Sequence, residues 1–349
     1  MIIRPYQETD RQAWDGYVYQ HPDAYHAHLA GWKDVIEQTY KKKSYYLVAE
    51  KDLKIVGVLP LFHIKSRLFG NTLVSMPYLT YGGILANNDT IIEKLLDEAL
   101  EMADDLNAVL ELRHVKPLSE ELYDSEKTQI NDSKVSMRLE LPQSSEELFN
   151  SFKAKLRSQI RRPQKEGMIF KLGGPELIKD FYRVFTVNMR DLGSPVHSKK
   201  LFENIFKYMD NTVRIGIVYY NHKAVGAGII SLFKYFVEIP WASTLKKYNK
   251  FSPNMLLYWS FLEYTTNNGF KYFDFGRSKS GEGTYKFKKQ WGSIEYNLKW
   301  FYFYNNDKNY ANTSVEAKKS IKLMISLWSK LPLKFSNVLG PILRKQVSL

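Results

Sequence analysis

The chain repeats one short pattern, and this repeat constrains its fold more than any other feature. Residues 47–50 (LVAE) and 54–59 (KIVGVL) resemble residues 217–220 (IVYY) and 223–228 (KAVGAG). Each copy is typical of a β-hairpin, because two apolar stretches flank a short polar turn. Helices are predicted before each hairpin, and more sheet, a helix and a strand after it. The repeat predicts two copies of one mixed α/β unit. A chance likeness of two short apolar hairpins is the alternative.

A chain of 349 residues is too long for one ordinary core, which also favours two domains. We expect an α/β fold with α+β mixed sheets, with domains at 1–143 and 144–304. Residues 305–349 are expected to form a linker and a basic amphipathic tail. Such a tail lies on an anionic membrane or docks on its own protein. The apolar face of the predicted tail helix consists of Ile321, Met324, Ile325, Trp328 and Leu331.

Composition narrows the class of protein. A hydrophobic content of 44% and a charged content of 25% are typical of soluble globular proteins. The absence of cysteine excludes disulfides, thiolate catalysis and cysteine-ligated zinc. His21, His26 and His28 match no zinc spacing, so no metal is expected. The first residues lack a signal-peptide core, and no window of some twenty residues is apolar. We expect a cytoplasmic location, with the inner face of the membrane as an alternative.

The charge balance points to anionic partners. The net charge is +13, which attracts molecules that carry phosphate, or anionic lipid. A capping box at Ser144 and Glu147 predicts the start of a helix. Apolar residues follow at four-residue spacing (Leu148, Phe152, Leu156, Ile160), and the other positions are rich in lysine and arginine. This helix either faces an anion or presents a solvated basic face.

The reactive site is expected in residues 271–292. Lys271–Phe275 predicts a strand that ends at Gly276, and a polar, glycine-containing loop follows. The segment from Tyr285 to Gly292 alternates cations with aromatic residues. A strand end, a flexible loop and clustered cations suit a large anionic substrate. The alternative is that Phe287 and Trp291, four residues apart, bury one helical face while the lysines are solvated.

Other motifs in the chain carry less information. Asp274-Phe275-Gly276 spells a kinase triplet, but the catalytic and glycine-rich loops of kinases are missing. Residues 223–228 faintly resemble the pyrophosphate loop of acetyl-CoA acyltransferases, although they lie inside a predicted hairpin. The predicted strand-to-helix turn at 247–252 is not rich in glycine. This argues against a standard acyl-CoA site without excluding one.

These motifs together resemble the FemABX family, tandem GNAT-like aminoacyltransferases that extend peptidoglycan cross-bridges. The resemblance rests on the repeat, on the basic helix at 155–162 and on Phe287-Lys288…Trp291-Gly292. The chain is more similar still to the FemAB-like proteins associated with exosortase (PEP-CTERM) systems, over nearly its whole length. The segments that carry this second likeness are 44–49, 57–61, 66–70, 81–83, 190–193, 274–278, 331–333 and 339–341.

The resemblance implies two tandem GNAT-like domains and a defined reaction. An aminoacyl group would pass from aminoacyl-tRNA to an amine of a nucleotide-sugar or lipid-linked envelope precursor, without a permanently bound cofactor. The long coiled-coil arm that some family members use for tRNA is missing here. The exosortase-associated subgroup belongs with surface polysaccharide systems, so the acceptor need not be peptidoglycan.

The resemblance also implies site residues. Lys288 matches the lysine of the family signature, and Arg190 and Lys33 fall near positions that bind the nucleotide-sugar precursor. A lysine ammonium in a dry cleft can stabilise the oxyanion and the leaving group, so we expect Lys288 to be catalytic. Arg277 and Lys286, with Arg190, would hold phosphates.

Three further expectations concern the rest of the site. Asp274 or Glu282 would relay the proton, although Asp274 could equally cap the loop. Phe287 and Trp291 are expected to contact the substrate. We expect no covalent enzyme intermediate, because no activated nucleophile is visible.

Two other functions fit the same residues. The donor could be an acyl-CoA or an acyl carrier protein rather than aminoacyl-tRNA. The chain could also be a non-catalytic binder of nucleic acid or anionic polymer on the same fold. A catalytic cleft would place Lys288, Arg277 and Arg190 around one cavity, whereas a binder would spread its cations over a surface.

Overall fold

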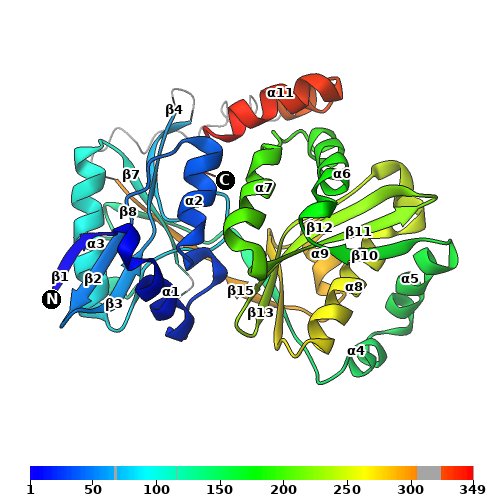
Figure 1. The fold of residues 1–349 in the computed structure, drawn as a ribbon, viewed down its shortest axis with the longest axis horizontal. Helices are drawn as coiled ribbons and strands as arrows, with labels where there is room; N and C mark the ends of the chain where they lie inside the picture. Colours follow the sequence, from blue (N-terminus) through cyan, green and yellow to red (C-terminus); the bar gives the residue numbers. More distant parts are fainter. Residues whose placement is uncertain (67–68, 115, 305–323, 349) are drawn as a thin grey trace. The chain divides into compact units, whose positions relative to one another are not determined.

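The computed structural model describes residues 1–66, 69–114, 116–304 and 324–348 (Figure 1). These residues divide into two compact units. Unit 1 holds residues 1–134, 297–304 and 345–348, and unit 2 holds 135–296 and 324–344. Both units combine helices with mixed sheets, which confirms the predicted fold class. None of the described helices is long and apolar enough to cross a membrane.

Unit 1 contains a four-stranded sheet in the order β1-β2-β3-β6 and a five-stranded sheet in the order β4-β5-β7-β16-β8. Helix α3 packs its apolar face against β2, β3 and β7, because Leu95, Leu96 and Ala99 recur at helical spacing and are buried. The elements are β1 (Ile2–Pro5), α1 (Arg11–Gln20), α2 (Gly31–Tyr40), β2 (Leu47–Lys51), β3 (Lys54–Leu59), β4 (Phe62–Ser66), β5 (Gly70–Val74), β6 (Leu85–Ala86), α3 (Asp89–Asp105), β7 (Val109–His114), β8 (Thr128–Asn131) and β16 (Lys299–Phe303).

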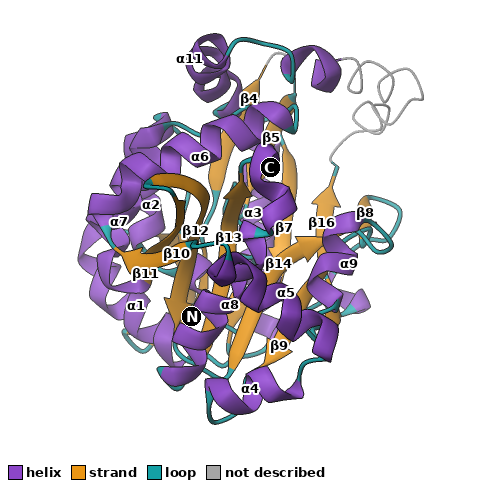
Figure 2. Cartoon of the chain, turned by 90° about the vertical axis from the view of Figure 1, so that its right-hand side faces the viewer, coloured by secondary structure: helices purple, strands orange, loops and turns teal. Residues whose placement is uncertain are grey.

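Unit 2 is built on one seven-stranded sheet in the order β10-β11-β12-β13-β14-β9-β15. Helices α4 and α5 pack against α8, and Figure 2 shows α5, α8 and α9 on the viewer's side of this sheet. The elements are β9 (Val135–Glu140), α4 (Ser145–Ser151), α5 (Ala154–Lys165), β10 (Ile169–Gly173), α6 (Ile178–Asp191), α7 (Lys199–Met209), β11 (Val213–Tyr220), β12 (Lys223–Phe233), β13 (Phe236–Thr244), α8 (Pro253–Asn267), β14 (Tyr272–Ser278), α9 (Gly283–Lys289), β15 (Ile294–Asn297) and α11 (Leu333–Arg344).

The two predicted hairpins form and share their irregularities. The turn of β2–β3 places Asp52 and Leu53 at positive φ, and the turn of β11–β12 does the same with Asn221 and His222. Positive φ at both central residues gives the strand twist that a two-residue hairpin needs. Each hairpin also carries one register shift near its turn. The internal repeat is therefore confirmed, and a chance likeness of two hairpins is excluded.

Each unit also contains one pair of parallel strands joined by a helix. In unit 1, β5 and β7 are parallel and α3 connects them. In unit 2, β13 and β14 are parallel and α8 connects them. Parallel strands need such a crossover because a tight turn cannot join them. The repeat therefore extends from the hairpin through the helix to the following strand.

Two strands lie on the other side of the domain boundaries predicted from the sequence. Strand β9, expected in the first domain, pairs with β14 of unit 2. Strand β16, expected in the second domain, pairs with β7 and β8 of unit 1. In both units an antiparallel strand thus lies beside the second parallel strand, with one further strand beyond it. Local patterns do not show which sheet a strand joins, because its partners are distant in the chain.

The basic helix predicted after Ser144 is interrupted. Ser144 caps α4 by accepting a hydrogen bond from the Glu147 amide. Phe152 and Lys153 are extended, so α5 starts as a separate helix at Ala154. Leu148, Phe152, Leu156 and Ile160 are nevertheless all buried, as their spacing predicts. Pro163 does not stop α5, which continues to Lys165 before Gly167 turns the chain at φ +81°.

The described part of the tail, residues 324–344, docks on unit 2 through α11. This helix contacts α6, and the backbone of Gly340 lies so close to Val196 that a Cβ there would meet it at 2.8 Å. Arg344 donates a hydrogen bond from Nε to Nε2 of buried His197 at 3.0 Å. Of the predicted apolar face, Met324 and Ile325 are exposed, and Ile321 lies outside the described residues.

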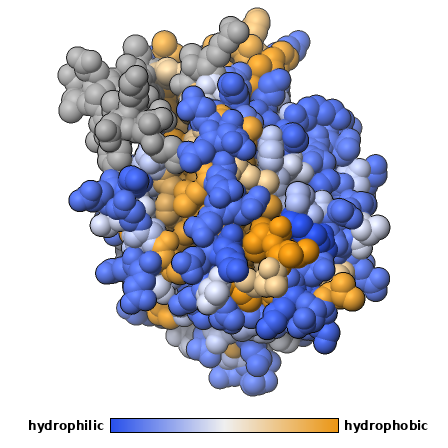
Figure 3. Space-filling model, turned by 90° about the vertical axis from the view of Figure 1, so that its left-hand side faces the viewer, coloured by the Kyte–Doolittle hydropathy of each residue, from blue (hydrophilic) through white to orange (hydrophobic). Residues whose placement is uncertain are grey.

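The outer surface is mixed in character. On the face shown in Figure 3, polar side chains predominate and apolar side chains form separate patches. Scattered apolar surface of this kind is normal for a globular protein and marks no site by itself.

Candidate functional site

The central feature of unit 2 is the point where β13 and β14 separate. The two strands pair at only three positions, of which Glu238 opposite Asp274 is the last. Pro240 follows in β13 and has no N–H to continue the ladder. In β14, Gly276 adopts φ +73° at a register shift against β9. A glycine bulge and a proline therefore open the sheet here, and we call this point the divergence site.

Asp274 holds the backbone of the divergence site. Its side chain lies on the opposite face of β14 from Phe273 and Phe275, because side chains alternate along a strand. It accepts hydrogen bonds from Ser136 Oγ at 2.5 Å and from the Gly276 amide at 2.7 Å. Arg138 Nε adds an ion pair at 3.3 Å. These contacts, at 1% exposure, support the role of a structural carboxylate that caps the loop.

Lys288 reaches the divergence site from α9. Its ammonium donates hydrogen bonds of 2.9 Å to the carbonyls of both Gly276 and Arg277. The side chain is only 8% exposed. Burial lowers the pKa of the Lys288 ammonium to about 8, although the carboxylates of Asp274 and Glu238 act in the opposite direction. A lysine with this pKa can donate or release a proton near neutral pH.

Phe287 and Trp291 fix α9 in place. Trp291 is fully buried and packs edge-on against Phe287 and Phe152, while Tyr258 of α8 packs edge-on against Phe287. This is the packing arrangement that their four-residue spacing predicts. Among the described residues, Trp291 Nε1 has no hydrogen-bond partner. The two aromatic residues thus anchor the helix that positions Lys288.

Of the remaining predicted residues, only Arg277 lies beside Lys288 in a described contact. Arg277 is half-buried next to Lys288, and its charge further lowers the pKa of that lysine. Lys286 is exposed on α9. Arg190, at the C-terminal end of α6, forms an ion pair with Asp191 at 2.6 Å. Lys33 belongs to α2 of unit 1, where it pairs with Glu37 at 3.2 Å.

Of the predicted residues, Lys288, Arg277 and Asp274 therefore come together. The exposed Glu282 precedes α9 and lies 3.9 Å from Lys279. Sequence reasoning missed Glu238 and Arg138, which complete the cluster. Glu238 is the only charged residue of β13, and this unusual placement was the available signal. Arg138 alternates with apolar residues in β9 as an ordinary polar strand residue does, so it gave no signal.

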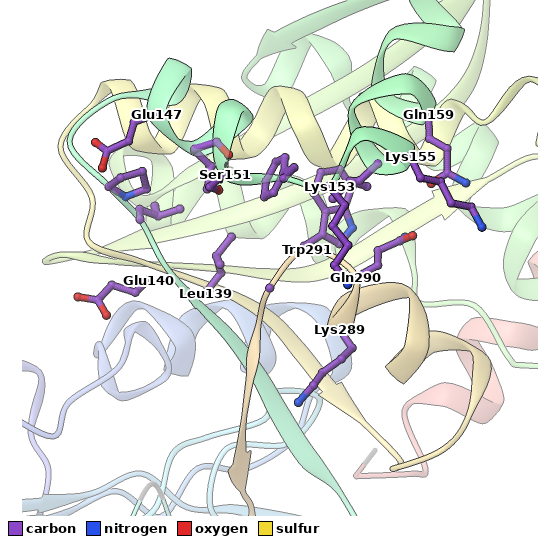
Figure 4. Close-up of a pocket in the computed structure, with 16 residues that line it drawn as sticks. Leu139, Glu140, Glu147, Ser151, Lys153, Lys155, Gln159, Lys289, Gln290 and Trp291 are labelled. Atoms are coloured by element: carbon purple, nitrogen blue, oxygen red, sulfur yellow. Dashed lines mark hydrogen bonds between the residues drawn. The ribbon is translucent and has the colours of Figure 1, made fainter.

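A groove of about 900 Å³ lies next to the C-terminal end of α9 (Figure 4). Its walls come from α4 and α5, from the end of β9 and from the turn after α9. In Figure 4, Glu140 and Glu147 lie at one end, and Lys155 and Gln159 at the other. The break between α4 and α5 places Lys153 at the rim. Lys288 does not line this groove, but its neighbours Lys289, Gln290 and Trp291 do.

Two lysines of the groove are available to a ligand. In the described part of the chain, neither Lys153 nor Lys155 has an ion-pair partner, whereas Lys289 pairs with Glu295 at 3.3 Å. Apolar side chains, including Leu139 and Leu156, lie between these cations and the buried core. An anion with an apolar part fits this combination of unpaired ammonium groups and apolar floor.

Comparison with known proteins identifies the architecture. Residues 150–289 match the family model of an acetyltransferase (GNAT) domain. The crystal structure of FemX matches 93% of this chain and 100% of its own, with a TM-score of 0.69 and 14% identity. L-PGS from Bacillus licheniformis matches over 94% and 99%, with a TM-score of 0.57 and 12% identity.

A tandem GNAT protein from the clavulanic acid biosynthesis pathway matches over 86% of this chain and 97% of its own. Its TM-score is 0.52 and its identity 12%. A comparison with curated proteins found no match to the sequence. At these identities the solved structures establish a shared tandem GNAT-like fold, and the family model adds an acyltransferase domain that includes α9.

Proposed function

We propose that this chain, an acyltransferase with a tandem GNAT-like fold, forms amide bonds on a precursor of the cell envelope. The observation that carries the proposal is the buried Lys288 ammonium at the divergence site. The favoured donor is aminoacyl-tRNA and the favoured acceptor is an amine. FemX and L-PGS share the fold, and the motif likeness to exosortase-associated FemAB-like proteins favours a surface-polysaccharide precursor over peptidoglycan.

In the proposed reaction, the neutral acceptor amine attacks the carbonyl carbon of the donor ester. The C–N bond forms, the C–O bond breaks, and the amine proton passes to the leaving oxygen or to water. The remaining N–H of Lys288 would donate to the oxygen of the tetrahedral intermediate and then to the leaving group. Asp274 would act by fixing the Gly276 carbonyl that orients Lys288, rather than by moving a proton.

Binding of the donor would use the cations around α9. Arg277 and Lys286 both precede Lys288 in sequence, and Lys153 and Lys155 supply unpaired charges at the groove. We assign these four residues to the phosphates of the donor. Arg190 and Lys33 are kept as proposed contacts of the precursor. Because both already form ion pairs, they would have to exchange an internal carboxylate for the ligand.

The test is transfer of a radiolabelled acyl group to crude envelope precursors. Aminoacyl-tRNA and acyl-CoA are compared as donors, with wild-type protein and the Lys288→Ala variant. Removal of one oxyanion donor is expected to lower kcat by about 10²–10³. Lys179→Ala, which removes an exposed lysine of α6, is the matched control and is expected to retain full activity.

The result also separates the alternatives. Transfer from acyl-CoA alone would replace the tRNA donor by an acyl-CoA or acyl carrier protein. A folded Lys288→Ala variant with wild-type transfer would overturn the catalytic assignment. If no donor reacts and nucleic acid still binds through Lys153 and Lys155, the chain is a binder rather than an enzyme.

We also propose that α11 contacts the inner face of the membrane. Phe335, Val338, Leu339 and Ile342 are exposed and recur at helical spacing, with Lys334 beside them. An apolar stripe flanked by cations suits an anionic bilayer. The wild-type protein is expected to sediment with vesicles of phosphatidylglycerol, whereas the Val338→Glu variant should remain in the supernatant. Equal sedimentation of both proteins would contradict the proposal.

A further inference from the structure

Unit 1 contains a divergence of parallel strands that corresponds to the divergence site of unit 2. Strands β5 and β7 pair at only three positions, of which Val74 opposite Glu111 is the last. The pair Glu238 and Asp274 ends the equivalent ladder in unit 2. In unit 2, Lys288 fills the space beyond the last pair. The repeat raises the question of what occupies this space in unit 1.

A buried polar cluster lies at this point of unit 1. Arg113 has no exposed surface, and its guanidinium forms an ion pair with Glu111 at 2.7 Å. It also donates to the carbonyls of Leu79 at 2.7 Å and Met76 at 3.3 Å. Met76 and Tyr78 adopt φ +56° and +72°. Non-glycine residues held at positive φ mark backbone that its surroundings force into an unfavourable shape.

The last described residues of the chain fill this space. The Ser348 carbonyl accepts hydrogen bonds from the Tyr78 amide at 2.7 Å and from Arg113 Nη2 at 3.1 Å. The Ser348 hydroxyl donates to the second carboxylate oxygen of Glu111 at 3.2 Å. Two residues earlier, the Gln346 side chain accepts from Ser66 Oγ at 3.0 Å.

These contacts have the character of ligand recognition. The Tyr78 amide and the Arg113 guanidinium both donate to the Ser348 carbonyl. The Glu111 carboxylate accepts a hydrogen bond from the hydroxyl of the same residue. A bidentate arrangement of charged and backbone donors gives geometric specificity as well as free energy. The Tyr78 amide that donates to the Ser348 carbonyl belongs to the loop with positive φ at Met76 and Tyr78.

We propose that unit 1 carries a peptide-binding slot at the divergence of β5 and β7, and that the chain's own C-terminal residues are its resident ligand. The slot takes an extended peptide, recognised through one main-chain carbonyl and one serine hydroxyl. The two halves of the repeat thus use the same opening differently: unit 2 fills it with a lysine side chain, and unit 1 with a peptide.

The test is binding of the missing segment in trans. Protein that ends at Arg344 is titrated with the peptide Lys-Gln-Val-Ser-Leu in a calorimeter, and full-length protein is the control. We expect saturable binding of one peptide to the shortened protein and none to the full-length protein. A peptide with Ser348→Ala is expected to bind about tenfold more weakly, because it leaves the Glu111 oxygen without its donor.

Absence of peptide binding to a shortened protein with wild-type circular dichroism would overturn the proposal, as would equal affinity for the serine and alanine peptides. If the shortened protein does not fold, carboxypeptidase digestion of the full chain replaces the titration. The slot should slow release of Leu349 and Ser348 relative to the free peptide, and Ser348→Ala should accelerate release of the tail. Equal rates for the wild-type tail and the free peptide would refute the slot.

Discussion

Burial of Lys288 opposes folding at neutral pH. The fall of its pKa from 10.5 to about 8 corresponds to a cost of about 3 kcal/mol at pH 7, where the ammonium is charged in both the folded and the unfolded chain. This is a net cost, which already includes the favourable interaction of the ammonium with the carboxylates of Asp274 and Glu238. A charged group that is buried at such a cost is typical of a functional position.

The stability of the wild-type protein relative to Lys288→Met is therefore expected to depend on pH. Between pH 8 and pH 10.5 the unfolded chain holds the Lys288 proton while the folded chain has lost it. The wild-type protein should gain up to about 3 kcal/mol over the variant as the pH rises through this window. Urea unfolding of both proteins at pH 7, 8, 9 and 10 measures the difference, and parallel curves would contradict it.

Asp274 is expected to contribute to the stability of the fold rather than directly to proton transfer. Asp274→Ala removes the acceptor of Ser136, the Gly276 amide and Arg138 at a nearly unexposed position. Breaking a buried ion pair in this way costs about 3–5 kcal/mol, whereas Asp191→Ala breaks a partly exposed pair and should cost below about 1 kcal/mol. Urea unfolding compares the two variants. Equal losses of unfolding free energy in the two variants would contradict a structural role of Asp274.

The elements show which features local sequence can specify. The hairpins were predictable because alternation and turn residues act within a dozen residues. The predicted domain boundaries placed β9 and β16 in the wrong units, because their partners β14 and β7 are chosen by contacts distant in the chain. The stripe of Leu148 and Phe152 predicted burial correctly, yet it could not show that the chain is extended at Phe152 and Lys153.

The candidate site was predictable in part for the same reason. Lys288, Arg277 and Asp274 lie within fifteen residues of one another, so one local segment contained them. Glu238 and Arg138 reach the same cluster from two other strands of the sheet. No local pattern links these strands to residues 271–292, and only the fold brings them together.

Because β9 belongs to unit 2 and β16 to unit 1, the choice of fragment ends should decide whether unit 2 folds alone. A fragment of residues 135–297 retains all seven strands of the unit 2 sheet, whereas 144–304 lacks β9 and carries β16 without its partner β7. We expect a cooperative thermal transition and near-ultraviolet circular dichroism from the first fragment only. A cooperative transition of the second fragment would show that β9 is dispensable.

For the whole molecule, the net charge of +13 is expected to appear in the salt dependence of donor binding. If Lys153 and Lys155 contact donor phosphates, replacing either by alanine should reduce the slope of log Kd against log salt concentration by about 1. Fluorescence anisotropy of labelled tRNA measures the slope, and Lys179→Ala is the control. An unchanged slope in both groove variants would place the donor elsewhere.

Strand β16 follows unit 2 in the sequence but belongs to the sheet of unit 1, so that sheet can be completed only late in synthesis. When residue 134 leaves the ribosome, the sheet of unit 1 still lacks β16, which emerges about 165 residues later. At 5–20 residues per second this delay is on the order of 10 s. The open edge of β7 is exposed to the cell throughout that interval, so the first half of the nascent chain depends on the second for protection from aggregation.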